Sequence, residues 1–358
     1  MKINRQRAIS KFNHFSAEST PFLFIVDFQG ENCVVEPLDS IDERELKFWV
    51  NGKTNVSIER GQGSGEGKEV KLEKYPLAFA QYKKGFDYVQ KNIFQGNSFL
   101  TNLTCETPVD LNISLSEVFR QSQAKYKLWW EDRFVCFSPE IFVQINETGK
   151  ISSFPMKGTI DASIPNAEDI LLNDRKELYE HTTIVDLIRN DLSSVAEKVW
   201  VEKFRYIDTI KTQNKTQLLQ VSSQISGLLP GNWRDNLGEI LFSMLPAGSI
   251  TGAPKAKTVE IIQKAEQETY VRVGGQTSKR GFYSGIFGVF DGKSLDSGVM
   301  IRFIEQKTDG SLTFKSGGGI TANSIAEKEY EEMIQKIYVP IVRDHTVTKP
   351  KTVQSCLP

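Results

Sequence analysis

The chain has 358 residues, of which 39% are hydrophobic and 25% are charged. This composition is ordinary for a folded globular protein and excludes disorder along the whole chain. The formal net charge is -1, so no global basic field is available to attract nucleic acid or an anionic membrane surface. A small anionic substrate held by a few local cations remains compatible with this charge.

The hydrophobic pattern alternates between strand-like and helical spacing along the chain. In chain order it predicts strands at 21–27 and 33–35, a helix at 75–95, strands at 99–105, 126–130, 134–137 and 141–145, a helix at 174–192, a strand at 216–225, a helix opening at Pro254, strands at 281–290, 295–304 and 312–314, and a terminal helix from Ser324. Many hairpin-like strands with few helices indicate an α+β fold with antiparallel sheets.

Residues 51–74 are rich in glycine and charge and contain the run GQGSGEGK from Gly61. A phosphate-binding P-loop needs Ser or Thr after its Gly-Lys pair, whereas Glu69 follows Lys68 here. We therefore expect a flexible loop. Residues 1–75 are assigned as N-terminal strands and this loop, within the same folding unit as the rest.

The four cysteines stand singly, without a C-x-x-C pair, at Cys33, Cys105, Cys136 and Cys356. A zinc site or a disulfide framework needs patterned spacing, so we expect reduced thiols packed as small hydrophobic side chains. Residues 1–10 are polar and basic, unlike a secretory signal, and no apolar run reaches the roughly 18 residues that cross a bilayer. We expect a cytoplasmic protein without a membrane or nucleic-acid partner.

The predicted helix at 174–192 carries acidic residues on its apolar face. At 3.6 residues per turn, Glu177 and Glu180 project from this face, with His181 beside them. The apolar residues of the same face are Leu178, Ile184, Val185, Leu187, Ile188 and Leu192. Two buried carboxylates cost several kcal/mol unless a cation compensates them. Pairing with Arg or Lys, a position at the rim of the core, and metal binding all remain open.

The terminal helix has a similar arrangement. Ser324 and Glu327 form a capping-box pattern, which predicts the start of the helix. Its apolar stripe consists of Ala326, Tyr330, Met333 and Ile337. Glu329, Glu332 and Lys336 line one edge of that stripe. A solvated acidic face would explain them, but two carboxylate pairs beside apolar faces could also supply hard oxygen ligands for Mg²⁺.

Glycine-rich turns provide two further candidate sites. Residues 245–255, LPAGSITGAPK, place Gly248 and Gly252 before a helix that starts with Pro254, Lys255 and a nearby lysine, Lys257, and such an N-terminus suits an anion. The run from Gly317 to Gly319 is expected between a strand and the terminal helix, where bare backbone can approach a ligand. Glycines in turns also occur for purely structural reasons.

A single lysine stands inside a tight connection at residues 154–160, FPMKGTI, marked by Pro155 and Gly158. Lys157 would ordinarily be solvated. A lysine becomes a nucleophile only where desolvation or neighbouring cations lower its pKa.

In this order, the motifs resemble those of the chorismate-utilising enzymes over roughly residues 98–339. They are SFPMKGT, KELYEH with IVDLIRNDL, LPAGSITGAPK, GFYSGIFG, the strand ending at Ile301-Arg302, GGGI and AEKEYEE. The resemblance implies one compact unit in which two large antiparallel sheets pack together with outer helices. It makes residues 76–340 the chorismate-binding catalytic domain and residues 341–358 a C-terminal tail.

The resemblance also implies a Mg²⁺ ion that holds the ring carboxylate of chorismate. Glu180 and Glu329 resemble direct or near-direct ligands, and Glu177 and Glu332 resemble residues that act through metal-bound water. The implied catalytic residues are Lys157, Thr159, Glu180 and His181. The implied substrate-binding residues are Gly248, Ser249, Thr251, Tyr283, Arg302, Gly317, Gly318, Gly319 and Lys336.

Lys157 selects among the members of the family. Anthranilate and isochorismate synthases typically carry alanine at this position, whereas lysine resembles the aminodeoxychorismate synthases of folate biosynthesis, in which it attacks C2 before ammonia attacks C4. His181 instead resembles the anthranilate synthases, whose component I is the alternative, although the chain lacks their N-terminal Leu-x-Glu-Ser motif. Leu100 stands where many relatives have glutamine, which leaves the local polar chemistry open.

The chain contains no G-x-C-x-G glutaminase elbow. Ammonia is therefore expected from a separate glutamine amidotransferase subunit, and an aminodeoxychorismate lyase would act on the product. A non-catalytic partner protein with the same fold is the alternative from another class. The complete set of carboxylates, together with Arg302 and Lys157, argues against it.

Overall fold

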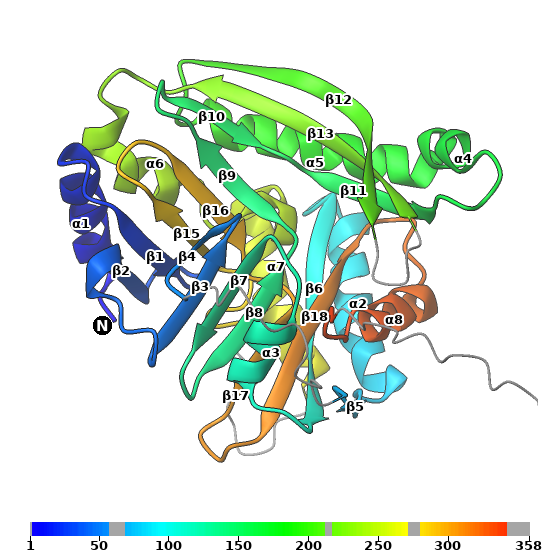
Figure 1. The fold of residues 1–358 in the computed structure, drawn as a ribbon. Coiled ribbons are helices and arrows are strands. Elements are labelled where there is room, and N and C mark those ends of the chain that lie inside the picture. The colour runs from blue at the N-terminus through cyan, green and yellow to red at the C-terminus, as the bar shows by residue number, and fades with distance from the viewer. Residues whose placement is uncertain (1, 57–68, 212–216, 271–279, 342–358) are drawn as a thin grey trace, which may run out of the picture.

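The computed structural model describes residues 2–56, 69–211, 217–270 and 280–341. The glycine-rich run from Gly61 and the tail beyond residue 341 lie outside this description. Two nine-stranded antiparallel sheets form the body of the molecule, with helices around them (Figure 1). The predicted α+β class and its two sheets are confirmed.

The first sheet has the order β11-β13-β10-β9-β16-β15-β1-β2, with β12 paired to β13. Its strands are β1 (Phe22–Val26), β2 (Cys33–Pro37), β9 (Ile141–Ile145), β10 (Lys150–Ser153), β11 (Met156–Asp161), β12 (Lys198–Lys211), β13 (Gln217–Leu228), β15 (Ile286–Phe290) and β16 (Leu295–Val299). All five residues of β1 and all five of β15 are buried, because this part of the sheet is covered on both faces. Their continuous apolar runs follow from that double cover.

The second sheet has the order β14-β6-β18-β17-β8-β7-β3-β4, with β5 paired to β6. Its strands are β3 (Leu46–Val50), β4 (Lys53–Thr54), β5 (Leu72–Lys74), β6 (Leu100–Leu111), β7 (Tyr126–Trp130), β8 (Phe134–Ser138), β14 (Gly252–Ala253), β17 (Phe303–Gln306) and β18 (Leu312–Ile320). Apolar residues of β1 and β15 share one buried cluster with residues of β3, β7, β8 and β17. The two sheets therefore pack face to face.

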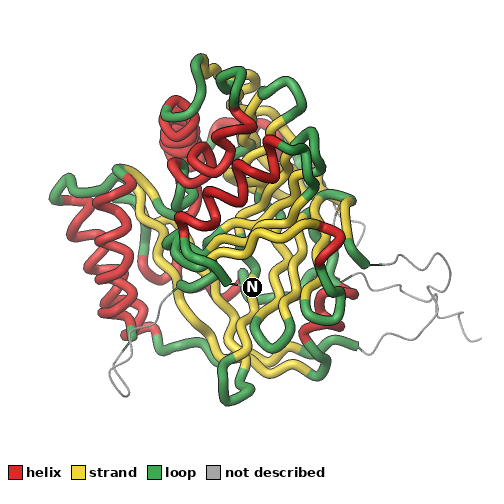
Figure 2. Tube along the Cα trace, turned by 90° about the vertical axis from the view of Figure 1, so that its left-hand side faces the viewer, coloured by secondary structure: helices red, strands yellow, loops and turns green. Residues whose placement is uncertain are grey.

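The helices lie outside the sheets (Figure 2). They are α1 (Arg5–Ala17), α2 (Phe79–Phe94), α3 (Leu115–Gln121), α4 (Ala167–Asn173), α5 (Arg175–Ser193), α6 (Leu237–Ser243), α7 (Lys255–Thr269) and α8 (Ala326–Gln335), with short 3₁₀ turns η1 (Leu38–Ser40), η2 (Trp233–Asn236) and η3 (Gly248–Ile250). Within the described residues no helix combines the length and apolar character needed to cross a membrane.

Three local predictions are wrong. The run at 295–304 forms two strands in different sheets, and the chain crosses between them at Arg302, whose φ is +54°. Apolar residues stand on both sides of the crossing, at 299–301 and 303–304, so the sequence alone predicts a single strand. The glycines from Gly317 lie inside β18 rather than after it. The capping box is absent, since the Ser324 hydroxyl accepts from the Thr321 backbone N–H at 3.1 Å and Ile325 caps α8 without a side-chain bond.

The helix predicted to start at Pro254 starts one residue later, at Lys255. Pro254 is the N-cap of α7, with extended backbone, rather than the first helical residue. Helix α5 agrees with the prediction, since Asp174 caps it by accepting from the Glu177 backbone N–H at 3.0 Å. Helix α1 was not predicted, because its polar and basic sequence shows only a short apolar stripe that packs on the first sheet.

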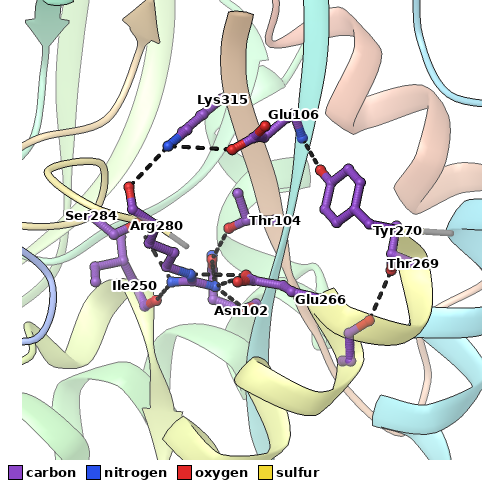
Figure 3. Close-up of polar contacts among 11 residues, drawn as sticks. Asn102, Thr104, Glu106, Ile250, Glu266, Thr269, Tyr270, Arg280, Ser284 and Lys315 are labelled. Carbon is purple, nitrogen blue, oxygen red and sulfur yellow. Dashed lines mark hydrogen bonds and ion pairs between the residues drawn. The ribbon is translucent and has the colours of Figure 1, made fainter. Parts of the chain in front are cut away.

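A buried arginine, Arg280, joins segments that lie far apart in the sequence (Figure 3). The Arg280 guanidinium donates to the Glu266 carboxylate of α7 at 2.7 and 2.9 Å, to the Ile250 carbonyl of η3 at 3.0 Å and to the Asn102 carbonyl of β6 at 2.8 Å. Lys315 of β18 donates to the Arg280 carbonyl at 3.1 Å. A buried guanidinium is tolerated only when its donors are satisfied, so these partners are held in one arrangement.

We predict that Glu266→Ala lowers the free energy of unfolding by about 3–5 kcal/mol, because the Arg280 charge stays buried without its counter-ion. Glu266→Gln should cost less, since it keeps the shape and one acceptor. Urea unfolding followed by circular dichroism measures both. As a control, Asp87→Ala breaks the exposed Lys83–Asp87 pair and should cost less than about 1 kcal/mol. Equal losses in Glu266→Ala and Asp87→Ala would contradict this account.

Candidate active site

Lys157 lies on β11, at the end of the first sheet, and not in the tight turn expected from the sequence. β11 pairs with β13, and the register shifts between Lys157 and Thr159. Gly158 is the extra residue of this bulge, with φ of +73°. A Cβ placed at Gly158 would lie 3.1 Å from Oε2 of Glu177. Glycine is therefore required here, and the bulge sets Lys157 beside the first turns of α5.

The glycine strand β18 brings the two sheets together at this point. A Cβ placed at Gly319 would lie 3.7 Å from the Lys157 Nζ. A Cβ placed at Gly318 would lie 3.6 Å from Oε2 of Glu329 and 3.7 Å from the Lys336 Nζ. Because successive residues of a strand face opposite sides, the α8 side chains lie on the side of β18 that Gly318 faces and Lys157 lies on the side that Gly319 faces.

Two cations on the α8 side have defined partners. Lys336 forms a salt bridge with Glu332 at 2.7 Å and donates to the Gly317 carbonyl at 2.9 Å. Arg302 donates to the Lys336 carbonyl at 2.6 Å, and its guanidinium lies 4.8 Å from the centre of the Tyr338 ring. Arg302 has a positive φ at the crossing between the sheets, which places its side chain against the end of α8.

The predicted acidic face of α5 forms at Glu180 and His181, which are 8% and 1% exposed, with Glu177 half-buried. Leu178 was assigned to the same apolar face but is 39% exposed. Leu178 lies two helical turns before the buried Val185 and on the same side of α5. The first turn of α5 therefore extends beyond the part of the protein that buries Val185. Sequence spacing predicts the side of the helix on which a residue lies, but it does not predict whether neighbouring segments bury that end of the helix.

His181 is held by a buried hydrogen-bond network. Its Nε2 lies 2.7 Å from the Ser223 hydroxyl, which also accepts from the Arg205 backbone N–H at 2.9 Å. The Arg205 side chain donates to the Leu172 carbonyl of α4 at 2.7 Å. Burial, then the charges of Arg205 and Lys157, lower the pKa of His181 to about 4. His181 is therefore neutral near pH 7 and lies within electrostatic reach of Lys157.

Glu140 belongs to this site and was missed in the sequence. Its carboxylate accepts from the Ser249 hydroxyl of η3. Burial raises the pKa of Glu140, and the Ser249 hydrogen bond and the charges of Lys157, Lys336 and Arg302 oppose that rise. A partly buried carboxyl with a raised pKa keeps its proton to higher pH, which suits a general acid.

The available signal for Glu140 is its position in the sequence SPE. Glu140 stands directly between two buried strands, 134–138 and 141–145. A carboxylate in this position must either reach solvent at the edge of the sheet or accept a hydrogen bond from a buried donor. Sequence spacing does not bring Ser249 near it, because that contact joins residues 109 positions apart.

Other predicted site residues have structural partners. The Thr251 hydroxyl donates to the Ala247 carbonyl at 2.9 Å. Tyr283 is buried, and its ring packs edge-on against Phe303. Thr159 is exposed on β11. Gly248 fits against α5, because a Cβ there would lie 2.9 Å from Oδ2 of Asp191.

The two lysines expected to bind an anion at the start of α7 also have acidic partners. Lys255 pairs with Asp191 at 2.7 Å, and Lys257 pairs with Glu260 at 2.7 Å. The Lys255–Asp191 salt bridge joins the start of α7 to the end of α5, so Lys255 already has an acidic partner within the protein.

The carboxylates of α5 and α8 have the chemistry that Mg²⁺ prefers. Glu180 and Glu329 are buried, and hard carboxylate oxygens are typical Mg²⁺ ligands. Across the described residues, no three His, Cys, Asp or Glu side chains lie close enough together to hold a metal in the present side-chain positions. The donor types fit the ion, and magnesium binding by Glu177, Glu180, Glu329 and Glu332 stays a prediction.

A cleft runs along α5 from Ile184 to Leu192. We call it the α5 cleft. Lys157, Glu140 and Ser249 line it together with apolar residues. Lys157 lies toward the Ile184 end of the cleft. Its neighbour Gly158 lies close to Glu177, in the first turn of α5.

A family model described as chorismate binding enzyme matches residues 19–341. The chain belongs to this family. The family predicted from the sequence motifs is therefore confirmed.

Relatives within the family carry different names. A Haemophilus influenzae protein named an uncharacterized PabA-like protein is 49% identical over 336 residues, which cover 94% of this chain and 97% of that protein. Aminodeoxychorismate synthase component 1 of Bacillus subtilis is 28% identical over 279 residues, covering 74% of this chain and 55% of that protein.

Solved structures agree on the fold. A Bacillus anthracis protein described as a putative 2,3-dihydroxybenzoate-specific isochorismate synthase matches with a TM-score of 0.66 and 19% identity, covering 94% of this chain and 88% of that chain. At this identity the likeness supports the fold alone.

Proposed function

We propose that this chain transfers the nitrogen of ammonia to C4 of chorismate and forms 4-amino-4-deoxychorismate. The observation that carries the proposal is the place of Lys157, whose amine lies beside the bare backbone of Gly319. Arg302 and Lys336 supply nearby positive charge for a dianionic substrate, and Glu140 supplies a partly buried carboxyl with a raised pKa. The Bacillus subtilis relative, named aminodeoxychorismate synthase component 1, supports the same reaction.

In the proposed reaction Lys157 is the nucleophile and Glu140 is the acid. The neutral amine of Lys157 attacks C2 of the ring, the double bond shifts, and the C4 hydroxyl leaves as water with the proton of Glu140. Ammonia then attacks C4, the double bond shifts back, and the bond between C2 and Lys157 breaks. The new ammonium group returns its proton to Glu140, and lysine leaves as the neutral amine, so both groups are regenerated.

We propose Mg²⁺ as the cofactor. Glu180 and Glu329 would hold it, with Glu177 and Glu332 beside them. The bound ion would supply positive charge for the ring carboxylate of chorismate. Lys336 and Arg302 would complete the binding of a compact dianion at the end of β18.

We propose a separate glutamine amidotransferase as the source of ammonia, with an aminodeoxychorismate lyase acting on the product. Within the described residues, Cys33, Cys105 and Cys136 are buried free thiols. Burial raises the pKa of each of them. A glutaminase needs an accessible thiolate, so these cysteines do not suit that role.

Anthranilate synthase component I is a second candidate, and His181 favours it. This residue resembles the histidine of the anthranilate synthases and lies within electrostatic reach of Lys157. Incubation with chorismate, Mg²⁺ and an ammonium salt distinguishes the two products, because anthranilate is fluorescent and aminodeoxychorismate is not. A fluorescent product would replace the first proposal with the second.

We predict that Lys157→Ala lowers the rate of C4 amination by at least about 100-fold, because the nucleophile is lost. Without ammonia, the wild-type chain with chorismate and Mg²⁺ should form a covalent adduct on the peptide containing Lys157, which mass spectrometry detects. Lys150→Ala serves as a control, because Lys150 lies in the same sheet but pairs with Glu202 at the surface. A Lys157→Ala variant that makes the same C4 amine at the wild-type rate refutes the nucleophile.

We predict that Glu140→Gln lowers kcat by about 10²–10⁴-fold, because glutamine keeps the shape but cannot donate the proton. In the wild type, kcat should fall as pH rises through the raised pKa of Glu140, since only the protonated carboxyl acts as the acid. The pH profile of kcat measures this limb, which the variant should lack. Wild-type kcat in Glu140→Gln would remove Glu140 from the chemistry.

We predict that Mg²⁺ raises the melting temperature of the wild-type chain, and that Glu180→Gln and Glu329→Gln each weaken this response by removing a ligand charge. Differential scanning fluorimetry across a Mg²⁺ series measures it independently of activity. Glu331→Gln is the matched control, because Glu331 is exposed on the same helix as Glu329. An unchanged response in both Glu180→Gln and Glu329→Gln would exclude these carboxylates as ligands.

A further inference from the structure

Strand β12 forms one edge of the first sheet. It pairs with β13 along its length, and among the described residues no other strand pairs with it. Figure 1 shows it at the outer rim of that sheet. Alternate residues of an edge strand point their backbone N–H and C=O groups away from the sheet, so these groups can pair with a further strand.

The regular part of this edge is short. Val201 and Phe204 are 39% and 52% exposed, so apolar side chains reach solvent along the strand. After Val201 the register of β12 against β13 shifts twice, and Arg205 has a φ of +48°. Such irregularities bend an edge and end its pairing. A strand added to β12 would therefore pair with its first few residues, from Lys198 to about Glu202.

The charges along this stretch are self-complementary. The run EKVWVEK, which starts at Glu197, meets its own reverse when two copies lie antiparallel. A two-fold axis at Trp200 places Lys198 opposite Glu202 of a second copy, and Glu197 opposite Lys203. The two valines of the run face each other, and the two Trp200 residues meet on the axis. Opposite charges, paired β-branched residues and paired aromatic residues all stabilise antiparallel strands.

The carboxylate of Glu202 has an oxygen available for such a partner. Within the chain it accepts from the Lys150 amine at 2.7 Å, from the Ser226 hydroxyl at 2.6 Å and from the Gln224 amide at 3.1 Å. All three of these bonds go to Oε2. Oε1 can therefore accept from a donor that belongs to another molecule.

Lys198, Trp200 and Glu202 lie on one face of the sheet. The Nζ atoms of Lys198 and Lys150 each lie 5.9 Å from the centre of the Trp200 ring, and Lys150 also bonds Glu202. Residues directly opposite each other in an antiparallel pair share a face. Lys198 of one copy and Glu202 of the other would therefore stand side by side.

We propose that two copies of this chain form a dimer by antiparallel pairing of their β12 strands about a two-fold axis at Trp200. The first sheets of the two copies then form one continuous sheet. Because each copy uses its β12 edge in the pair, the contact closes at two copies. The paired run is short, so we expect a dissociation constant in the micromolar range. This inference uses no residue of the candidate active site and is independent of the proposed function.

Charge reversal tests the pairing. Sedimentation of the wild-type full chain over roughly 1–200 µM should show a transition from monomer to dimer. Lys198→Glu and Glu202→Lys each bring like charges together across the axis and should weaken dimerisation at least about tenfold. An equal mixture of these two variants should dimerise again, because each position then meets the opposite charge. Native mass spectrometry, with an affinity tag on one variant, identifies the mixed dimer.

Lys84→Glu is the matched control, because it makes the same change at an exposed lysine of α2. It should leave dimerisation at the wild-type level. Melting temperatures show whether each variant is folded. In the wild type, amide hydrogen exchange in the peptide that contains residues 198–202 should slow as the protein concentration rises, because pairing protects the outward N–H groups.

Three results would overturn the proposal. The first is a wild-type chain that stays monomeric over the whole concentration range. The second is a dimer that persists in both Lys198→Glu and Glu202→Lys, or that Lys84→Glu weakens equally, because the contact would then lie elsewhere. The third is a mixture of the two folded variants that stays monomeric, because complementary charges would then fail to restore the pair.

Discussion

The buried guanidinium of Arg280 constrains much of the structure, because all of its donors must be satisfied away from water. It does so by bonding Glu266 of α7, Ile250 of η3 and Asn102 of β6. η3 carries Ser249 to Glu140, and β6 is the strand on which β18 and its glycines are aligned. The buried Arg280 charge therefore helps to position both η3, which carries Ser249, and β6, on which β18 is aligned.

The site arises where the ends of the two sheets meet. Lys157 comes from the end strand of the first sheet, while Lys336 and Glu329 come from α8, which packs on β18 of the second. Gly318 and Gly319 present bare backbone on opposite faces of β18, toward the α8 side chains and toward Lys157 respectively. Packing of the sheets, rather than any single loop, sets these distances.

Burial assigns different roles to the ionisable groups around that space. It raises the pKa of Glu140 and lowers that of His181, so one carboxyl tends to keep its proton while the histidine stays neutral.

The sequence by itself determined the class of the fold, most of the long elements, the family, and the acidic faces of α5 and α8. The fold class, the elements and the acidic faces depend on local periodicity, which 3.6-residue and 2-residue spacing express directly. The family was indicated by the resemblance of the motifs. Only the tertiary structure decided that 295–304 is divided between two sheets, that Lys157 lies on a bulged strand, and that Ser249 reaches Glu140. Those features depend on contacts between segments that are distant in the sequence. Such contacts leave no periodic pattern in the chain.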